Sequence, residues 1–142
     1  MNIGMIGLGK LGLPVAIAID IHGHNVMGYD INNKVMQKEN CLYKEEGPNG
    51  EPSIEPLLQK SNLMFGSINE VAAHSEIIFI AVQTPHEERY EGITPIPYER
   101  VDFDYTYLIN SIKLLEKAIS EIKKDVVVVV ISTVMPGTFR SK

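Results

Sequence analysis

Apolar and polar residues follow two alternating patterns along this chain. Short runs that are almost entirely apolar recur, and between them lie longer stretches in which apolar residues return at helical spacing. The apolar runs predict strands at residues 2–6, 25–30, 63–65, 77–82 and 126–131. Runs of this kind are typical of parallel strands covered on both faces, so we expect 126–131, a valine-rich run, to be fully buried.

Helices are predicted between these strands. The pattern places them at residues 10–22, 32–40, 53–59 and 69–74, with a long helix after Asp104. Gly23 is expected to end the first helix, and Asn32 is a typical N-cap for the second. The long helix carries an apolar stripe at Leu108, Ile112, Leu115, Ile119 and Ile122. Residues 41–52 and 83–103 have the proline-containing polar composition of loops. This order predicts one α/β domain over residues 1–142, a doubly wound parallel sheet with helices on both faces.

The first predicted strand leads directly into a glycine motif. Gly7, Gly9 and Gly12 have the spacing G-x-G-x-x-G between a strand and a helix. In a Rossmann-type unit the first glycine permits the tight turn, the second lets a pyrophosphate approach the backbone, and the third lets the helix pack closely on the sheet. The helix N-terminus also favours phosphate. An ordinary glycine turn has the same spacing, so the motif needs its context to be informative.

An acidic residue at the end of the second predicted strand supplies that context. Asp30 follows Gly12 by 18 residues, about where such units place the carboxylate that binds a ribose hydroxyl. The same charge repels a 2′-phosphate, so we expect the cofactor to be NAD rather than NADP. Polar groups also follow two other strands, at Thr84 and at Thr133. Carboxyl ends of strands are where ligands bind in such sheets, although either threonine could simply end its strand.

Composition and charge narrow the possible partners. The chain has 13 basic and 18 acidic residues, a net charge of −5, and no basic run, which argues against a nucleic-acid surface. The single cysteine, Cys41, excludes an internal disulfide and a cysteine-based metal site, and His22 and His24 have no third ligand nearby in the sequence. No apolar stretch reaches the roughly 18 residues of a membrane span. We therefore expect a cytoplasmic protein without metal, membrane or nucleic-acid partners.

Six sequence signatures, in this order, resemble the N-terminal domain of the UDP-glucose/GDP-mannose 6-dehydrogenase family. They are residues 7–14 (GLGKLGLP), 28–30 (GYD), 52–57 (PSIEPL), 82–85 (VQTP), 104–107 (DYTY) and 131–138 (ISTVMPGT). The last is the most specific, although Met135 stands where many members have proline.

The resemblance implies an NAD-dependent oxidation of a UDP- or GDP-sugar primary alcohol to a carboxylate, through a thioester on a cysteine. It implies that Asp30 binds the adenosine ribose, that Lys34 lies near a position touching this ribose, and that the amides of Lys10 and Leu11 meet the pyrophosphate. Thr84 and Thr133 are expected along the nicotinamide half, with Thr133 also near the catalytic water. The implied cofactor-binding set is therefore Gly7, Gly9, Lys10, Leu11, Gly12, Asp30, Lys34, Thr84 and Thr133.

The family's cysteine nucleophile has no counterpart in these 142 residues, because Cys41 matches no catalytic position. We expect the chain to be the cofactor domain of a longer protein, inactive alone, whose central helical and sugar-nucleotide domains are absent. A homodimer is expected only of that longer protein. The sequence also allows two other interpretations of the function: a stand-alone module that senses dinucleotides, and another NAD-dependent dehydrogenase of the β-hydroxyacid type.

Overall fold

A five-stranded parallel sheet forms the centre of the domain. The computed structural model describes residues 1–37, 53–90, 99 and 101–141. Within them the strands are β1 (Asn2–Ile6), β2 (Asn25–Tyr29), β3 (Met64–Phe65), β4 (Ile77–Ile80) and β5 (Val127–Val130). They lie in the order β3-β2-β1-β4-β5, and every neighbouring pair is parallel. The predicted doubly wound α/β architecture is therefore confirmed.

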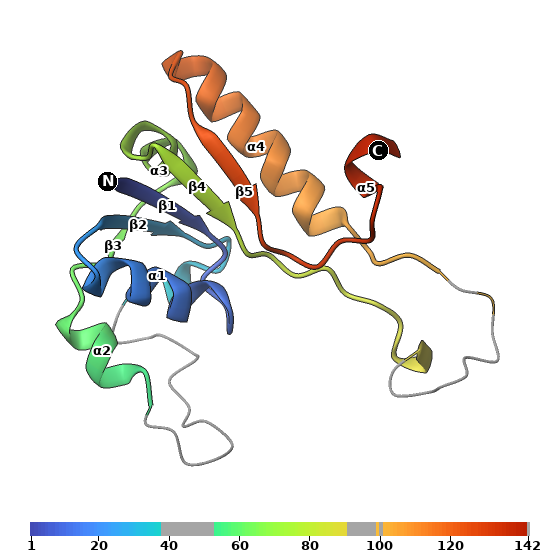
Figure 1. Ribbon diagram of the computed structural model, residues 1–142, viewed down its shortest axis with the longest axis horizontal. Helices are drawn as coiled ribbons and strands as arrows, with labels where there is room; N and C mark the ends of the chain where they lie inside the picture. The colour runs from blue at the N-terminus through green and yellow to red at the C-terminus, as the bar shows by residue number, and fades with distance from the viewer. Residues whose placement is uncertain (38–52, 91–98, 100, 142) are drawn as a thin grey trace.

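Helices cover the sheet on both faces. They are α1 (Gly12–Ile21), α2 (Glu55–Lys60), α3 (Ile68–His74), α4 (Thr106–Ile122) and the short α5 (Thr138–Ser141). Figure 1 shows α1 and α2 on one side of the sheet, and α3 and α4 on the other. No helix in the described part of the chain is long and apolar enough to cross a membrane.

Local sequence signals explain where these helices begin and end. Gly23 follows α1 with φ of +87°, a conformation that glycine adopts without the steric strain of a Cβ. The Ser67 side chain accepts a hydrogen bond from the Glu70 amide, and the Glu70 carboxylate accepts one from the Ser67 amide, so α3 begins with a capping box. Before α4, the Asp104 carboxylate accepts the Thr106 amide at 2.9 Å, although the N-cap residue itself is Tyr105, whose side chain makes no capping hydrogen bond.

Two apolar clusters hold the layers together. One lies between the sheet and α1, and contains Met5, Leu8, Leu13, Ala16, Ile17 and Val26 among its buried members. The other lies beneath α3 and α4, and contains Ile6, Val71, Ile78, Ile80, Leu108 and Leu115. All five residues of the predicted stripe on α4 belong to this second cluster or pack against it. Burial on both faces of β1 explains why residues 3–6 have no polar side chain, whereas Asn2 at its start is only half-buried.

The prediction that the last strand is fully buried is wrong. Val127 is 59% exposed and Val128 is 41% exposed, because β5 lies at one edge of the described sheet and pairs with β4 alone. The strand is also shorter than predicted. A valine-rich run indicates a high propensity to form a strand, but the position of that strand in the sheet decides how much of it neighbouring elements bury.

The predicted helix over 32–40 is wrong over residues 32–37, and residues 38–40 lie outside the described part of the chain. Residues Asn33–Val35 form a single 3-10 turn, η1, and the next two residues are a bend. Asn32 does cap this turn, because its side chain accepts a hydrogen bond from the Lys34 amide at 3.2 Å. The predicted loop at 41–52, with Cys41, lies outside the described residues.

Candidate functional site

A cleft opens at the carboxyl ends of three neighbouring strands. Its volume is about 320 Å³, and its lining comes from the loop after β1, from the segment after β4 and from the segment after β5. The lining residues are Gly9, Lys10, Leu11, Ala81, Val82, Gln83, Thr84, Ile131, Ser132 and Thr133. The three segments meet because β4 lies between β1 and β5 in the sheet. This is the edge at which ligands bind in open parallel sheets.

The glycine loop has the backbone geometry that its spacing predicts. Gly7 has φ of +90°, and a Cβ there would lie 2.7 Å from the Ala81 carbonyl oxygen. A Cβ on Gly12 would collide with the Gly7 carbonyl, so α1 starts in close contact with the turn before it. At Gly9, by contrast, no heavy atom of the described residues other than its two chain neighbours lies within 4 Å of an added Cβ. The first and third glycines are required by the protein's own packing, and the second faces open space.

Backbone donors are available beside this open space. Within the described part of the chain, the amides of Lys10 and Leu11 donate no hydrogen bond to another protein group. They precede α1, whose first residue is Gly12 and whose cap at Leu11 has no side-chain hydrogen bond. Helix N-termini carry partial positive charge and leave their first amides without intrahelical acceptors. The arrangement suits an anionic group resting over Gly9.

Asp30 lies beside the glycine loop and is bound to it. Its carboxylate accepts the Leu8 amide at 2.8 Å through one oxygen and the Asn32 amide at 2.8 Å through the other. The loop is tied to β2 a second time, because the Gly7 amide donates to the Tyr29 carbonyl at 2.8 Å. Asp30 is half-buried, and a carboxylate has about four acceptor positions, so about two remain for a ligand.

The two threonines are brought together by the sheet. Thr84 and Thr133 both line the cleft, although they are far apart in the sequence. Thr133 is exposed, and its neighbour Ser132 is buried with its hydroxyl donating to the Val82 carbonyl at 2.8 Å. Ser132 therefore fixes the segment after β5 against the segment after β4, and Thr133 faces the space between them.

Four of the nine predicted cofactor-binding residues do not line this cleft. Gly7 and Gly12 lie in the glycine loop itself, whereas Asp30 and Lys34 lie after β2, on the other side of that loop. Lys34 is exposed in η1, directly beyond Asp30. The set therefore extends from the end of β2, past the glycine loop, to the ends of β4 and β5.

Sequence reasoning did not include Gln83 or Ser132 in the site, nor the bond from Leu8 to Asp30. Gln83 and Ser132 adjoin Thr84 and Thr133 at the same strand ends, which is the signal that could have identified them. The Leu8 amide carries no sequence signal of its own, because any residue there would donate the same bond.

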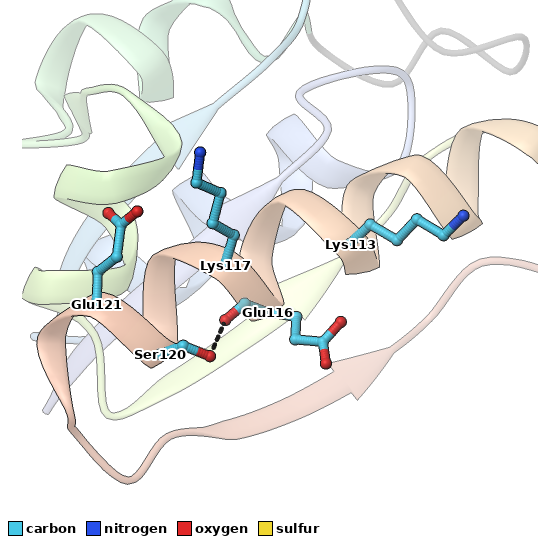
Figure 2. A pocket seen from close by; sticks show the side chains of 5 residues that line it. All are labelled: Lys113, Glu116, Lys117, Ser120 and Glu121. Atoms are coloured by element: carbon cyan, nitrogen blue, oxygen red, sulfur yellow. Dashed lines mark hydrogen bonds between the residues drawn. The ribbon is translucent and has the colours of Figure 1, made fainter.

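A larger hollow, of about 410 Å³, lies elsewhere. Figure 2 shows that its five lining residues all come from α4: Lys113, Glu116, Lys117, Ser120 and Glu121. It is an open, charged stretch on the surface of one helix, and it shares no lining residue with the cleft at the carboxyl ends of the strands. No group of three or more metal-binding side chains occurs among the described residues. The chemistry of the domain therefore points to the cleft over the glycine loop.

Comparison with known proteins gives matches over the whole chain. A family model described as "UDP-glucose/GDP-mannose dehydrogenase family, NAD binding domain" matches residues 1–142. The chain is 32% identical to a UDP-glucose 6-dehydrogenase of Bacillus subtilis and 30% identical to a UDP-N-acetyl-D-mannosamine dehydrogenase of Pyrococcus horikoshii. These matches cover 97% of this chain, and 29% and 30% of the two relatives. A solved GDP-mannose dehydrogenase from Pseudomonas aeruginosa superposes with a TM-score of 0.78 at 28% identity, over 99% of this chain and 30% of that one.

Proposed function

Because the chain belongs to the UDP-glucose/GDP-mannose dehydrogenase family and corresponds to its NAD binding domain, we propose that the cleft is the cofactor-binding half of the active site of a nucleotide-sugar 6-dehydrogenase. The whole protein would oxidise the primary alcohol of a UDP- or GDP-sugar to the carboxylate. The chain spans about 30% of the relatives named above, so we assign to it the cofactor half of that reaction. The observation that carries the proposal is the convergence of the glycine loop, Thr84 and Thr133 on one cleft.

The glycine loop would hold the pyrophosphate. The open space over Gly9 lets phosphate oxygens approach the backbone, and the amides of Lys10 and Leu11 have hydrogens to donate to them. Gly7 and Gly12 take no direct part in this contact, because their role is to form the turn and to bring α1 close to it. The fit rests on donors and space that the protein itself does not use.

Asp30 and Lys34 would bind the adenosine end. The remaining acceptor positions of the Asp30 carboxylate would receive the hydroxyl hydrogens of the ribose. A 2′-phosphate at that place would meet a carboxylate, which explains the expected preference for NAD. Lys34 is exposed in η1, four residues after Asp30, and its long side chain would extend toward this ribose.

Thr84 and Thr133 would line the nicotinamide end. When bound there, the cofactor supplies an acceptor for the hydride that leaves the substrate alcohol. The exposed Thr133 hydroxyl would hydrogen-bond the carboxamide or a water in the active site. The catalytic nucleophile is not assigned to any residue here. We include in the proposal a dimer of the whole protein, which sedimentation of that protein would test, and a cytoplasmic location, which cell fractionation would test.

The test exploits the open space at Gly9. We expect Gly9→Val to weaken NADH binding more than roughly tenfold, because the new side chain would occupy the pyrophosphate position. Since an added Cβ has no protein atom near it, the thermal midpoint should change by less than about 2 °C. Fluorescence titration of NADH and a melting curve followed by circular dichroism measure the two quantities.

Ala73→Val is the matched control, since Ala73 is exposed on α3 and remote from the cleft, and it should bind NADH normally. Unchanged affinity in Gly9→Val would contradict the site. So would a wild-type chain that binds no NADH, or one that prefers NADPH by about tenfold, given the charge at Asp30.

A further inference from the structure

One buried tyrosine joins two segments that approach the cleft from different parts of the chain. Tyr105 is only 4% exposed, and its ring belongs to the apolar cluster beneath α4. Its hydroxyl donates to the Asp102 carboxylate at 2.6 Å. The same oxygen accepts the Met135 amide at 3.1 Å, from the segment after β5. A buried hydroxyl with partners on both sides constrains both segments.

The orientation of these bonds is determined by chemistry. A phenol has one hydrogen, and the charged carboxylate of Asp102 is the stronger acceptor for it. The lone pairs of the Tyr105 oxygen are thereby left to face the Met135 amide. The Thr138 hydroxyl lies 3.5 Å from the same oxygen, but its own hydrogen goes to the Met135 carbonyl at 2.8 Å. Met135 is thus held through both its amide and its carbonyl.

Thr133 lies between two such attachments. On its N-terminal side, the Ser132 hydroxyl donates to the Val82 carbonyl, and the Ile131 amide donates to the Ile80 carbonyl at 2.9 Å. On its C-terminal side, Val134 packs against the apolar cluster beneath α4, and the next hydrogen bond is that from the Met135 amide to Tyr105. Removing this hydrogen bond would leave the segment after Thr133 held by the packing of Val134, without the bond that ties its backbone to Tyr105.

We propose that Tyr105 is a positioning residue for the nicotinamide end of the cleft. Its hydroxyl holds residues 133–135 in the conformation that turns Thr133 toward the ligand, and it contacts no ligand itself. The inference rests on the proposed function, because it takes Thr133 as a contact of the nicotinamide half. It assigns a binding role to a side chain outside the cleft lining.

The test separates the two halves of the cofactor. In the 142-residue chain, Tyr105→Phe should weaken NADH binding roughly three- to tenfold, the range expected for one ordinary hydrogen bond. Binding of ADP-ribose, which lacks the nicotinamide, should stay within about twofold, because the glycine loop and Asp30 are untouched. Calorimetric titration measures both. Tyr107→Phe is the matched control, since Tyr107 is 51% exposed in the first turn of α4, directly after Tyr105, and neither affinity should change.

Amide hydrogen exchange gives an independent readout. The Met135 amide should exchange faster in Tyr105→Phe than in the wild type, while the Ile131 amide, which is held by β4, should keep its rate. Asp102→Ala is a second variant that leaves the buried ring in place, because Asp102 is itself exposed. It should weaken NADH binding in the same direction and again spare ADP-ribose.

Two results would overturn the inference: NADH affinity unchanged in both variants, or NADH and ADP-ribose weakened equally. The second would mean that the hydroxyl stabilises the domain as a whole. Failure of the proposed function is distinguishable from either result, because then the wild-type chain itself would not bind NADH.

Discussion

The carboxylate of Asp30 stabilises the glycine loop, so its removal should cost stability before any cofactor is added. In Asp30→Ala, the Leu8 and Asn32 amides both lose an acceptor that lies at 2.8 Å. The two losses are unequal. Leu8 is fully buried, so its amide would be left without a partner, whereas Asn32 is exposed and water can replace the carboxylate there.

The magnitude follows from that difference. A buried donor without an acceptor costs about 1–3 kcal/mol, and an exposed one costs close to zero. For a domain of this size, 1 kcal/mol corresponds to a change of about 3 °C in the thermal midpoint, so we expect a decrease of about 3–9 °C. Asp30→Asn keeps one acceptor oxygen for the Leu8 amide, and its decrease should be less than half as large.

Thermal unfolding followed by circular dichroism, without cofactor, measures this effect. Asp125→Ala is the matched control, because Asp125 is exposed in the short segment before β5 and should leave the midpoint unchanged. Asp30→Ala should also bind NADH more weakly. Asp30→Ala and Asp30→Asn should both lose the preference for NADH over NADPH, because each removes the negative charge that repels a 2′-phosphate. A midpoint for Asp30→Ala within about 1 °C of the wild type would refute the reasoning about the Leu8 amide.

Two further predictions concern the rest of the fold. The pKa of Glu70 is lowered from its ordinary value of 4.5, first by the hydrogen bond from the Ser67 amide and then by that from the Ser67 hydroxyl. The contribution of the Glu70 carboxylate to stability is therefore complete above pH 4.5 and is lost as the pH falls through the lower folded-state pKa. We expect the thermal midpoint of Glu70→Gln to fall less than that of the wild type when melting curves are recorded from pH 7 down to pH 3. At the sheet edge, Val127→Thr should change the free energy of unfolding in urea by less than about 0.5 kcal/mol, and a loss above about 2 kcal/mol would show that this exposed valine is buried in solution.

Several features of the site could be predicted because they depend on residues close together in the sequence. The turn at Gly7, the close start of α1 at Gly12 and the acid at Asp30 all follow from one strand–turn–helix–strand unit. The apolar run of β1 likewise predicted a strand covered on both faces, since burial on both faces requires apolar residues at every position. The Asn32 cap was predicted correctly, although it begins only a 3-10 turn.

Other features were decided only by the tertiary structure. The apolar run of β5 predicted a buried strand, but its place at the sheet edge leaves Val127 exposed. The approach of Thr133 to Thr84 depends on the pairing of β4 with β5, and the bond from Met135 to Tyr105 joins residues 30 positions apart. Local patterns report propensity and periodicity, which act over a few residues. Strand order and side-chain contacts between distant segments minimise the free energy of the whole domain, so they appear only when the chain is folded.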